Sequence, residues 1–278
     1  MSAADHPDQA RIGVIGGSGL YRLLEDATQV EVGTPYGSPS SPLAVGLLNG
    51  ERVAFLARHG TGHTIPPQRV NYRANLWALA SRGVVAIIGS SAVGSLSPAM
   101  PSESFVVPDQ LIDRTRDRID TFYDGPDVQH LAFADPFDPG IRRLLIDALT
   151  SRSERFAPTG TTVVISGPRF STRAESKGWR SLGADIVNMT QYPEAALAAE
   201  LNLGYASLSF VTDTDTGHYV GDEPVTADVV FRRLSAARKR ITGVIGDAVA
   251  AVPTGYAPRD LIDPDAVARV MARDRSSP

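Results

Sequence analysis

The chain has 278 residues, of which 42% are hydrophobic and 21% are charged, with a formal net charge of −4 at pH 7. This composition is typical of a globular protein, and the acidic balance gives no electrostatic reason to expect binding to nucleic acid or to an anionic membrane. The absence of cysteine excludes disulfides, thiolate nucleophiles and cysteine-ligated zinc.

The five histidines show no HExxH-like spacing, so we expect no metal site. The N-terminal residues lack a basic leader, and no apolar run approaches the roughly 18–20 residues that a membrane span requires. We therefore expect a cytoplasmic protein without a membrane partner.

Short apolar runs along the chain predict buried strands, separated by segments with helical periodicity. Nearly continuous apolarity, rather than strict alternation, indicates strands that are covered on both faces. The predicted strands are 12–15, 52–56, 84–88, 104–107, 162–165, 185–187 and 205–210. The predicted helices are 69–81, 140–150, 193–202 and 226–252, the last with Thr226 as its N-cap. This order predicts a single α/β domain over residues 1–278, with a largely parallel or mixed central sheet flanked by helices and with flexible tails at 1–10 and 274–278.

The first predicted strand ends in a glycine-rich turn that contains Ser18. A dinucleotide-binding fingerprint would need a small residue at position 22, where Arg22 stands, so the spacing argues against that function. The turn amides and the Ser18 hydroxyl could instead approach an anion. A plain tight turn remains the alternative.

Arg58 and His59 follow the second strand, with two glycines and two prolines close behind them in the segment 60–67. A guanidinium offers two parallel donors that suit an oxyanion such as phosphate. A solvated loop is the alternative, although the glycines and prolines favour a fixed backbone. In the helix that follows, we expect Asn71 and Asn75 to serve as caps.

Small residues occupy positions 89–96, directly after the strand predicted to end at Ile88. They would let backbone amides close on a ligand, with Ser91 offering a hydroxyl and Ala92 an amide.

The segment 166–175 predicts a rigid turn that presents Phe170 for stacking on an aromatic ligand, with Ser171 bonding the ligand edge. A core aromatic beside a helix-capping serine is the alternative. Asn188, Met189 and Thr190 are expected to emerge at a strand end.

Asp213 and Asp215 follow the last predicted strand at a spacing that places both carboxylates on one side of an extended segment. Such a pair could hold the edge of a heteroaromatic base. A weak cation site or a solvated turn remains open from these residues alone.

In this order the motifs resemble those of the trimeric purine nucleoside phosphorylase family, and in particular its 5′-methylthioadenosine phosphorylases. The resemblance runs from Ile12 to about Val252. It implies reversible phosphorolysis of methylthioadenosine to adenine and 5-methylthioribose 1-phosphate. Inorganic phosphate would be a co-substrate and no cofactor would be needed. The family also implies a homotrimer with its sites at subunit interfaces.

The resemblance also implies a role for each matching residue. Phosphate would be held by Ser18, Arg58, His59, Ser91, Ala92 and Thr190. Base and ribose would contact Phe170, Ser171, Asn188, Met189, Asp213 and Asp215. The 5′ substituent would meet His63, His130, Ala227, Val230 and Phe231, with both histidines reaching the site of a neighbouring subunit.

Asp213 and Asp215 are the predicted catalytic residues, with Asp213 giving a proton or strong hydrogen bond to purine N7. This requires a carboxyl kept protonated near neutrality by burial and by its neighbour Asp215. Phosphorolysis of 6-oxopurine nucleosides or methylthioinosine, phosphate-independent hydrolysis and non-enzymatic dinucleotide binding are the alternatives. The departures from the family pattern at Gln191, Tyr192 and the segment 216–219 have no assigned role.

Overall fold

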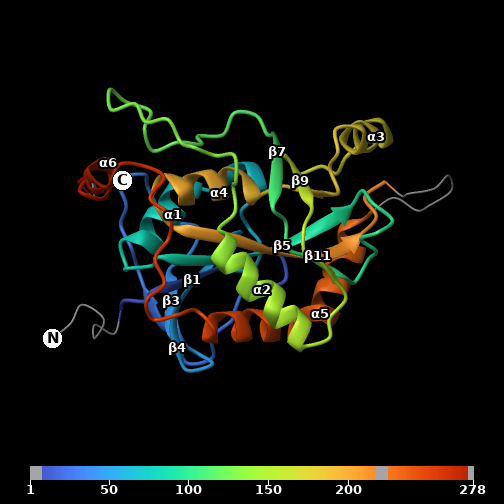
Figure 1. The fold of residues 1–278 in the computed structure, drawn as a ribbon, viewed down its shortest axis with the longest axis horizontal. Helices are drawn as coiled ribbons and strands as arrows, with labels where there is room; N and C mark the ends of the chain where they lie inside the picture. Colours follow the sequence, from blue (N-terminus) through green and yellow to red (C-terminus); the bar gives the residue numbers. More distant parts are fainter. Residues whose placement is uncertain (1–7, 217–224, 275–278) are drawn as a thin grey trace.

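A central mixed β-sheet organises the protein, seen edge-on in Figure 1. The computed structural model describes residues 8–216 and 225–274. Within them the strands run β2-β3-β4-β1-β5-β10-β9-β7 across the sheet, and β11 pairs with β5 and β6, which in turn pairs with β8. The strands are β1 (Ile12–Gly16), β2 (Thr28–Val30), β3 (Leu43–Leu48), β4 (Glu51–Ala57), β5 (Ala86–Ser95), β6 (Phe105–Val106), β7 (Gln110–Arg114), β8 (Phe156–Ala157), β9 (Thr161–Ile165), β10 (Ile186–Asn188) and β11 (Gly204–Asp213).

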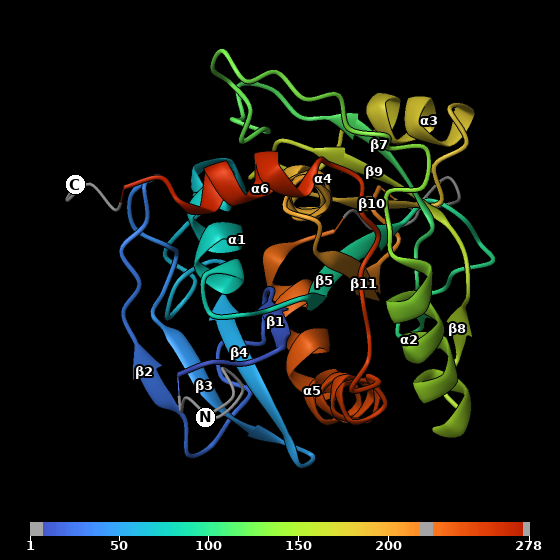
Figure 2. The same cartoon turned by 60° about the vertical axis from the view of Figure 1, so that its left-hand side comes forward.

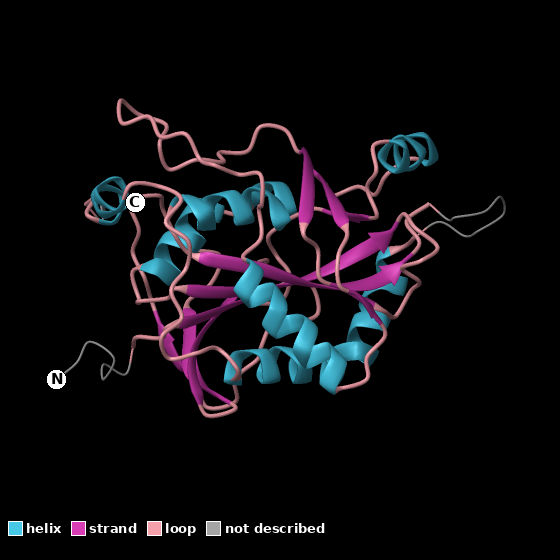
Figure 3. Cartoon of the chain, viewed as in Figure 1, coloured by secondary structure: helices cyan, strands magenta, loops and turns pink. Residues whose placement is uncertain are grey.

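Helices cover both faces of the sheet, as Figures 2 and 3 show. They are α1 (Tyr72–Ala80), α2 (Pro139–Ser151), α3 (Arg173–Ser181), α4 (Gln191–Glu200), α5 (Ala227–Ala250) and α6 (Pro264–Met271). One apolar core joins the sheet to α1 and α4, and a second joins it to α2 and α5. This is the two-faced α/β architecture that the buried strands predicted.

The alternation of side chains along β11 divides it between the two cores. Tyr205 belongs to the core beneath α1 and α4, whereas Ala206, Leu208 and Phe210 belong to the core beneath α2 and α5. Since successive side chains of a strand point to opposite faces, Ser207 and Ser209 face α4.

The sheet divides along β5. Strand β1 pairs with β5 up to Gly89, and β10 pairs with the same edge only from Gly94 onward. No described strand covers this edge at residues 90–93, while β11 continues along the other edge. Polar groups of β5 are therefore available to other parts of the chain at this split.

The helix starts follow local capping rules. The side chain of Asn71 accepts from Ala74 N, and that of Thr226 accepts from Val229 N, so both predicted caps are confirmed. Asn75 does not cap a helix, because its side chain bonds to Ser40. Within α4 the dihedral angles of Tyr192 are not helical. This explains why the helix predicted from the sequence begins only at Pro193.

Every predicted strand and helix is present, and the largest error concerns β5. It continues to Ser95 rather than ending at Ile88, because β11 pairs with it almost throughout. The strands β2, β3, β7 and β8 and the helices α3 and α6 were not predicted, and all of them span nine residues or fewer.

The predicted flexible N-terminal tail is wrong at Ala10, which is buried and donates its backbone N–H to Arg82 O. Residues 1–7 and 275–278 of the predicted tails lie outside the described residues. In the part of the chain that the structure describes, no helix is both long and apolar enough to span a membrane.

Candidate active site

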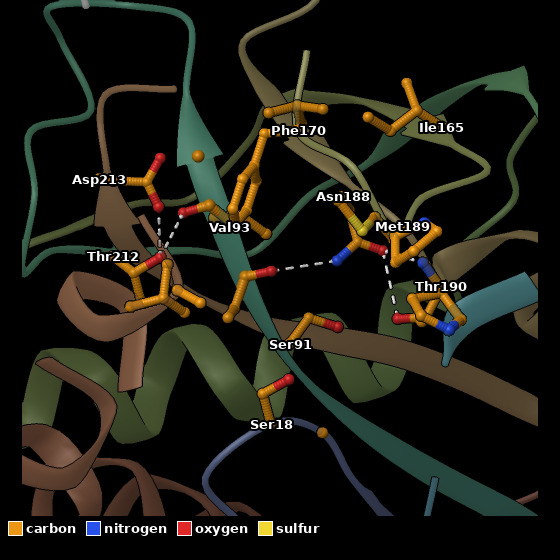
Figure 4. A pocket seen from close by; sticks show the side chains of 18 of the residues that line it. Ser18, Ser91, Val93, Ile165, Phe170, Asn188, Met189, Thr190, Thr212 and Asp213 are labelled. Carbon is orange, nitrogen blue, oxygen red and sulfur yellow. Dashed lines mark hydrogen bonds between the residues drawn. The ribbon is translucent and has the colours of Figure 1, made fainter. Parts of the chain in front are cut away.

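A cavity of about 230 Å³ opens at the split in the sheet (Figure 4). Of the residues predicted for the site, all but His130 line it. These are Ser18, Arg58, His59, His63, Ser91, Ala92, Phe170, Ser171, Asn188, Met189, Thr190, Asp213, Asp215, Ala227, Val230 and Phe231. Residues from seven separate segments of the sequence therefore meet around one space.

The cavity has two chemically different ends. In Figure 4, Ser18 and Ser91 lie toward one end, whereas Phe170 and Asp213 lie toward the other. We call the first the anion end, formed by Ser18, Arg58, His59, Ser91 and Thr190. We call the second the carboxylate end, formed by Phe170, Ser171, Asp213 and Asp215.

Arg58 is the cation of the anion end, and it is held rigidly. Its Nε and Nη2 atoms each donate to a carboxylate oxygen of Glu194 at 2.7 Å, and its Nη1 atom donates to Ser90 O at 2.9 Å. Tyr205 Oη also donates to Glu194, at 2.8 Å. Burial alone would lower the pKa of Arg58, but the Glu194 carboxylate more than offsets this and raises it.

A guanidinium has five N–H donors, and these contacts engage three. The other two, one on each Nη atom, have no acceptor among the described residues. Because Arg58 lines the cavity, they can serve a bound oxyanion. Glu194 thus orients the guanidinium without using all of its donors.

His59 is neutral in this environment. Burial, with a smaller contribution from the Arg58 charge, lowers the pKa of His59 to about 3. Nδ1 lies 2.9 Å from Ile65 O, and since a carbonyl only accepts, Nδ1 carries the proton. Nε2 therefore carries a lone pair and can accept a hydrogen bond from a protonated phosphate oxygen.

The glycine turn after β1 comes unusually close to this arginine. A Cβ atom on Gly17 would lie 2.3 Å from Ser90 O and 2.8 Å from Arg58 Nη1, so no side chain fits there. The close approach brings Ser18 to the cavity, as an anion-binding turn would require.

Asn188 organises the start of α4. Its Oδ1 accepts from Thr190 N and from Gln191 N, both at 2.7 Å, and its Nδ2 donates to Ala92 O at 3.2 Å. The side chain thus ties β10 and α4 to the uncovered edge of β5. Thr190, which also lines the cavity, makes no side-chain cap, and its hydroxyl donates to Asn188 Oδ1 at 3.4 Å.

Asp213 closes the carboxylate end from β11. Thr212 Oγ1 donates to its Oδ2 at 2.7 Å, and Asp215 N donates to its Oδ1 at 2.8 Å. Burial nevertheless raises the pKa of Asp213 to about 6, and the nearby Asp215 adds to the rise. The shift is in the direction that the predicted proton donor requires.

Asp215 has a left-handed backbone conformation, with φ at +53°, and burial raises the pKa of its carboxyl. Ser176 and Ser171 lie close enough to the carboxyl to offset part of this rise, yet Asp215 Oδ2 and Ser171 Oγ are buried without a hydrogen bond of normal geometry to any described residue. Buried polar atoms of this kind at a cavity wall are suited to a polar ligand edge.

Phe170 is 37% exposed, which rules out the core-aromatic alternative. Thr172, not Ser171, is the N-cap of α3, where it forms a capping box with Glu175. The capping alternative for Ser171 is therefore wrong as well.

His63 lies at the cavity of its own chain, and its predicted contact with a neighbouring site stays a prediction. Gly60 and Gly62 have φ of +72° and +83°, and His63 itself has φ of +60°, which turns the loop back over the cavity. The His63 ring centroid lies 4.6 Å from that of His59 and 5.3 Å from that of Phe231.

Ala227, Val230 and Phe231, from the first turns of α5, complete an apolar wall near His63. His130 is exposed and does not line this cavity. Its predicted contact with a neighbouring subunit stays a prediction.

Several residues at the site were not predicted. Glu194 is the most important, because a carboxylate next to a proline gives no local signal that it pairs with an arginine 136 positions away. Tyr192 does not line the cavity, and its hydroxyl donates to Asp120 instead. Residues 217–219 of the segment left without a role lie outside the described residues.

Comparison with known proteins assigns the family. Residues 11–250 match the sequence profile of the phosphorylase superfamily. The chain belongs to this superfamily. In the described ranges, no cluster of three or more His, Asp or Glu side chains could hold a metal ion.

Proteins similar to this chain include a purine nucleoside phosphorylase and several methylthioadenosine phosphorylases. A purine nucleoside phosphorylase of Streptomyces coelicolor is 50% identical over 88% of this chain and 90% of its own length. An S-methyl-5'-thioadenosine phosphorylase of Mycolicibacterium smegmatis is 51% identical over 78% and 82%. A methylthioadenosine phosphorylase of Schistosoma mansoni, solved with adenine, has a TM-score of 0.83 at 35% identity and covers 95% of this chain and 97% of its own.

Proposed function

We propose that this phosphorylase catalyses the reversible phosphorolysis of S-methyl-5′-thioadenosine to adenine and 5-methylthioribose 1-phosphate. The observation that carries the proposal is the division of one cavity into an anion end and a carboxylate end. An oxyanion at Arg58 and a purine at Asp213 would leave the sugar between them, where the bond must break. The many relatives named for this substrate support the same choice.

In the forward reaction a phosphate oxygen forms a bond to C1′ as the bond between C1′ and N9 breaks. The electron pair of the broken bond passes into the purine, which must be neutralised as it leaves. Asp213 gives its proton, or a strong hydrogen bond, to N7, a role that its raised pKa supports. The anion end holds phosphate in place, so orientation and electrostatic stabilisation provide most of the catalysis.

Adenine suits the carboxylate end better than a 6-oxopurine. A carboxylate oxygen of Asp215 or Asp213 accepts a hydrogen bond from the 6-amino group, whereas a 6-oxo group would present lone pairs to it. The unsatisfied Oδ2 of Asp215 supports this assignment.

The 5′ group would lie against the apolar wall of Ala227, Val230 and Phe231. Burying a methylthio group there contributes about 1–2 kcal/mol, whereas a 5′-hydroxyl would lose contacts with water. Methylthioadenosine is therefore expected to be a better substrate than adenosine.

A homotrimer would place His130 at a neighbouring site, and we propose this assembly for the enzyme. The segment that carries His130 exposes Ile119 and Val128 at 60% and 63%, and apolar side chains of this kind suit a protein interface. The cytoplasmic location stays a prediction from the sequence.

Phosphorolysis of 6-oxopurine nucleosides is the second candidate, because the Streptomyces coelicolor relative is named a purine nucleoside phosphorylase. The deciding experiment measures release of free base from methylthioadenosine, adenosine, inosine and methylthioinosine, with and without phosphate. We expect phosphate-dependent release that is fastest from methylthioadenosine. Faster release from inosine or methylthioinosine would favour the second candidate, and release without phosphate would indicate a hydrolase.

A further inference from the structure

Behind the anion end lies a buried polar cluster made of Gln191, Ser207 and Ser209. All three residues are 0% exposed, and they lie between α4 and β11. Gln191 Nε2 donates to Ser209 Oγ at 2.9 Å and to Ser207 Oγ at 3.0 Å. Neither serine lines the cavity, so the cluster can influence a ligand only through another residue.

Ser207 provides that link. Its Oγ lies 3.4 Å from the Oγ of Ser91, which lines the cavity, and the geometry makes Ser207 the donor. Among the described residues, Ser207 Oγ also lies 3.5 Å from the hydroxyl of Ser209, and either serine could donate in that contact. Ser209 makes no side-chain hydrogen bond to Ser91 within the described residues, although the two are register partners on neighbouring strands.

The two hydrogen bonds from Gln191 have a defined direction. An amide nitrogen has two N–H donors, and Gln191 uses one on each serine. Ser207 Oγ accepts from Gln191, and the geometry of its 3.4 Å contact with Ser91 makes Ser207 the donor there. Ser91 Oγ, having accepted that bond, keeps its own O–H free to donate into the cavity.

The orientation of the Gln191 amide also follows from its surroundings. Its Oε1 is buried and accepts no hydrogen bond from any described residue. Exchanging oxygen and nitrogen would place two N–H donors at that position, and a buried N–H without a partner is less tolerated than a carbonyl without one. The orientation that donates to both serines is the better one.

We propose that Gln191 and Ser207 are positioning residues that make Ser91 a hydrogen-bond donor to the phosphate co-substrate. The proposal rests on the proposed phosphorolysis for the identity of the anion. It gives Gln191, a residue that departs from the family pattern, a role in anion binding without direct contact. The role is specific to phosphate, because the cluster does not reach the carboxylate end.

Ser207→Ala and Ser209→Ala form a matched pair that tests this proposal. Both substitutions remove one buried hydroxyl that accepts from Gln191, yet only Ser207 links to Ser91. Ser207→Ala should raise KM for phosphate about fivefold, the effect of one hydrogen bond, with kcat and the nucleoside KM unchanged. Ser209→Ala should leave KM for phosphate unchanged. Equal effects of the two variants would overturn the proposal.

A second test combines Ser207→Ala with Gln191→Met, which removes the amide at similar length. If Gln191 acts through Ser207, the double variant should bind phosphate no more weakly than Ser207→Ala alone. Additive losses would show that Gln191 acts by another route. They would contradict the proposed relay, which is the chain of hydrogen bonds from Gln191 through Ser207 to Ser91. Melting temperatures of all variants separate these effects from loss of the folded protein.

For the same variants, calorimetry measures the Kd of inorganic phosphate for the free enzyme. This Kd does not depend on turnover, so the relay can be judged even if the wild-type protein fails to cleave methylthioadenosine. Failure to cleave would reject the proposed function. A phosphate Kd that is the same in Ser207→Ala and the wild type would reject the relay.

Discussion

The two ends of the cavity are built in different ways. At the anion end, Arg58 is fully buried, paired with Glu194 and anchored to β5, so its charge and orientation are set before any ligand arrives. At the carboxylate end, Asp213 and Asp215 are held by short-range contacts near the end of β11, and Phe170 beside them is partly exposed.

The difference concerns how each end obtains the charge state that it needs. The anion end keeps a cation charged in the interior by giving it a carboxylate partner. The carboxylate end does the opposite, because burial without a nearby cation of comparable strength raises the pKa of Asp213. One end is thus prepared to hold charge and the other to exchange a proton.

The largest effect is expected from breaking the anion end. Glu194→Ala would leave Arg58 buried without its counter-ion, so the free energy of unfolding should fall by about 3–5 kcal/mol. Urea denaturation measures this, and Asp147→Ala in the exposed Arg143–Asp147 pair serves as the control with no expected change. If both variants were equally stable, the buried pair would have no special role.

The carboxylate end should affect the chemical step rather than stability. Asp213→Asn removes the proton donor, so kcat on methylthioadenosine should fall by about 100- to 1000-fold while KM for phosphate is unchanged. Asp215→Asn should mainly raise KM for the nucleoside, because its carboxylate is expected to bind the base. Single-turnover kinetics at varied nucleoside concentration would measure both variants. Near-wild-type turnover by Asp213→Asn would show that Asp213 has no role in the chemical step.

The two ends should also have opposite effects on the pH dependence of stability. Between about pH 4 and 6 the folded state keeps His59 neutral while the unfolded state protonates it, so this term makes stability rise with pH. Asp213 stays protonated in the folded state and ionises in the unfolded state, so its term makes stability fall with rising pH.

His59→Gln should therefore make the slope of unfolding free energy against pH more negative, and Asp213→Asn should make it more positive. Each change is at most about 1.4 kcal/mol per pH unit. Denaturation at several pH values from 4 to 6 tests this. Slopes that change in the same direction would contradict the opposite protonation of the two ends.

The smallest effect is expected at the 5′ wall. Val230→Thr keeps the shape of the side chain but places a hydroxyl beside the expected methylthio group. The ratio of kcat/KM for methylthioadenosine to that for adenosine should fall about three- to fivefold. Ala237→Ser, on the same helix but away from the cavity, is the control. An unchanged ratio in Val230→Thr would show that the 5′ group does not contact this wall.

Local chemistry in the sequence identified most of the cavity. Ser18, Arg58, Ser91 and Asp213 each stand beside a predicted strand end or turn, where side chains of a parallel sheet become available to a ligand. The residue types also indicated the chemistry, because paired donors suit an anion and paired carboxylates suit a base edge. The order of apolar runs likewise predicted the α/β fold.

Only the tertiary structure decided how these groups behave. The partner of Arg58 is 136 residues away, and β5 extends to Ser95 because β11 lies beside it. His63 enters its own cavity through a loop conformation that glycines permit, and the donor role inferred for Ser91 depends on Gln191 across a packed interface. Charge state and hydrogen-bond direction depend on burial and on distant neighbours, and these are set when the chain packs.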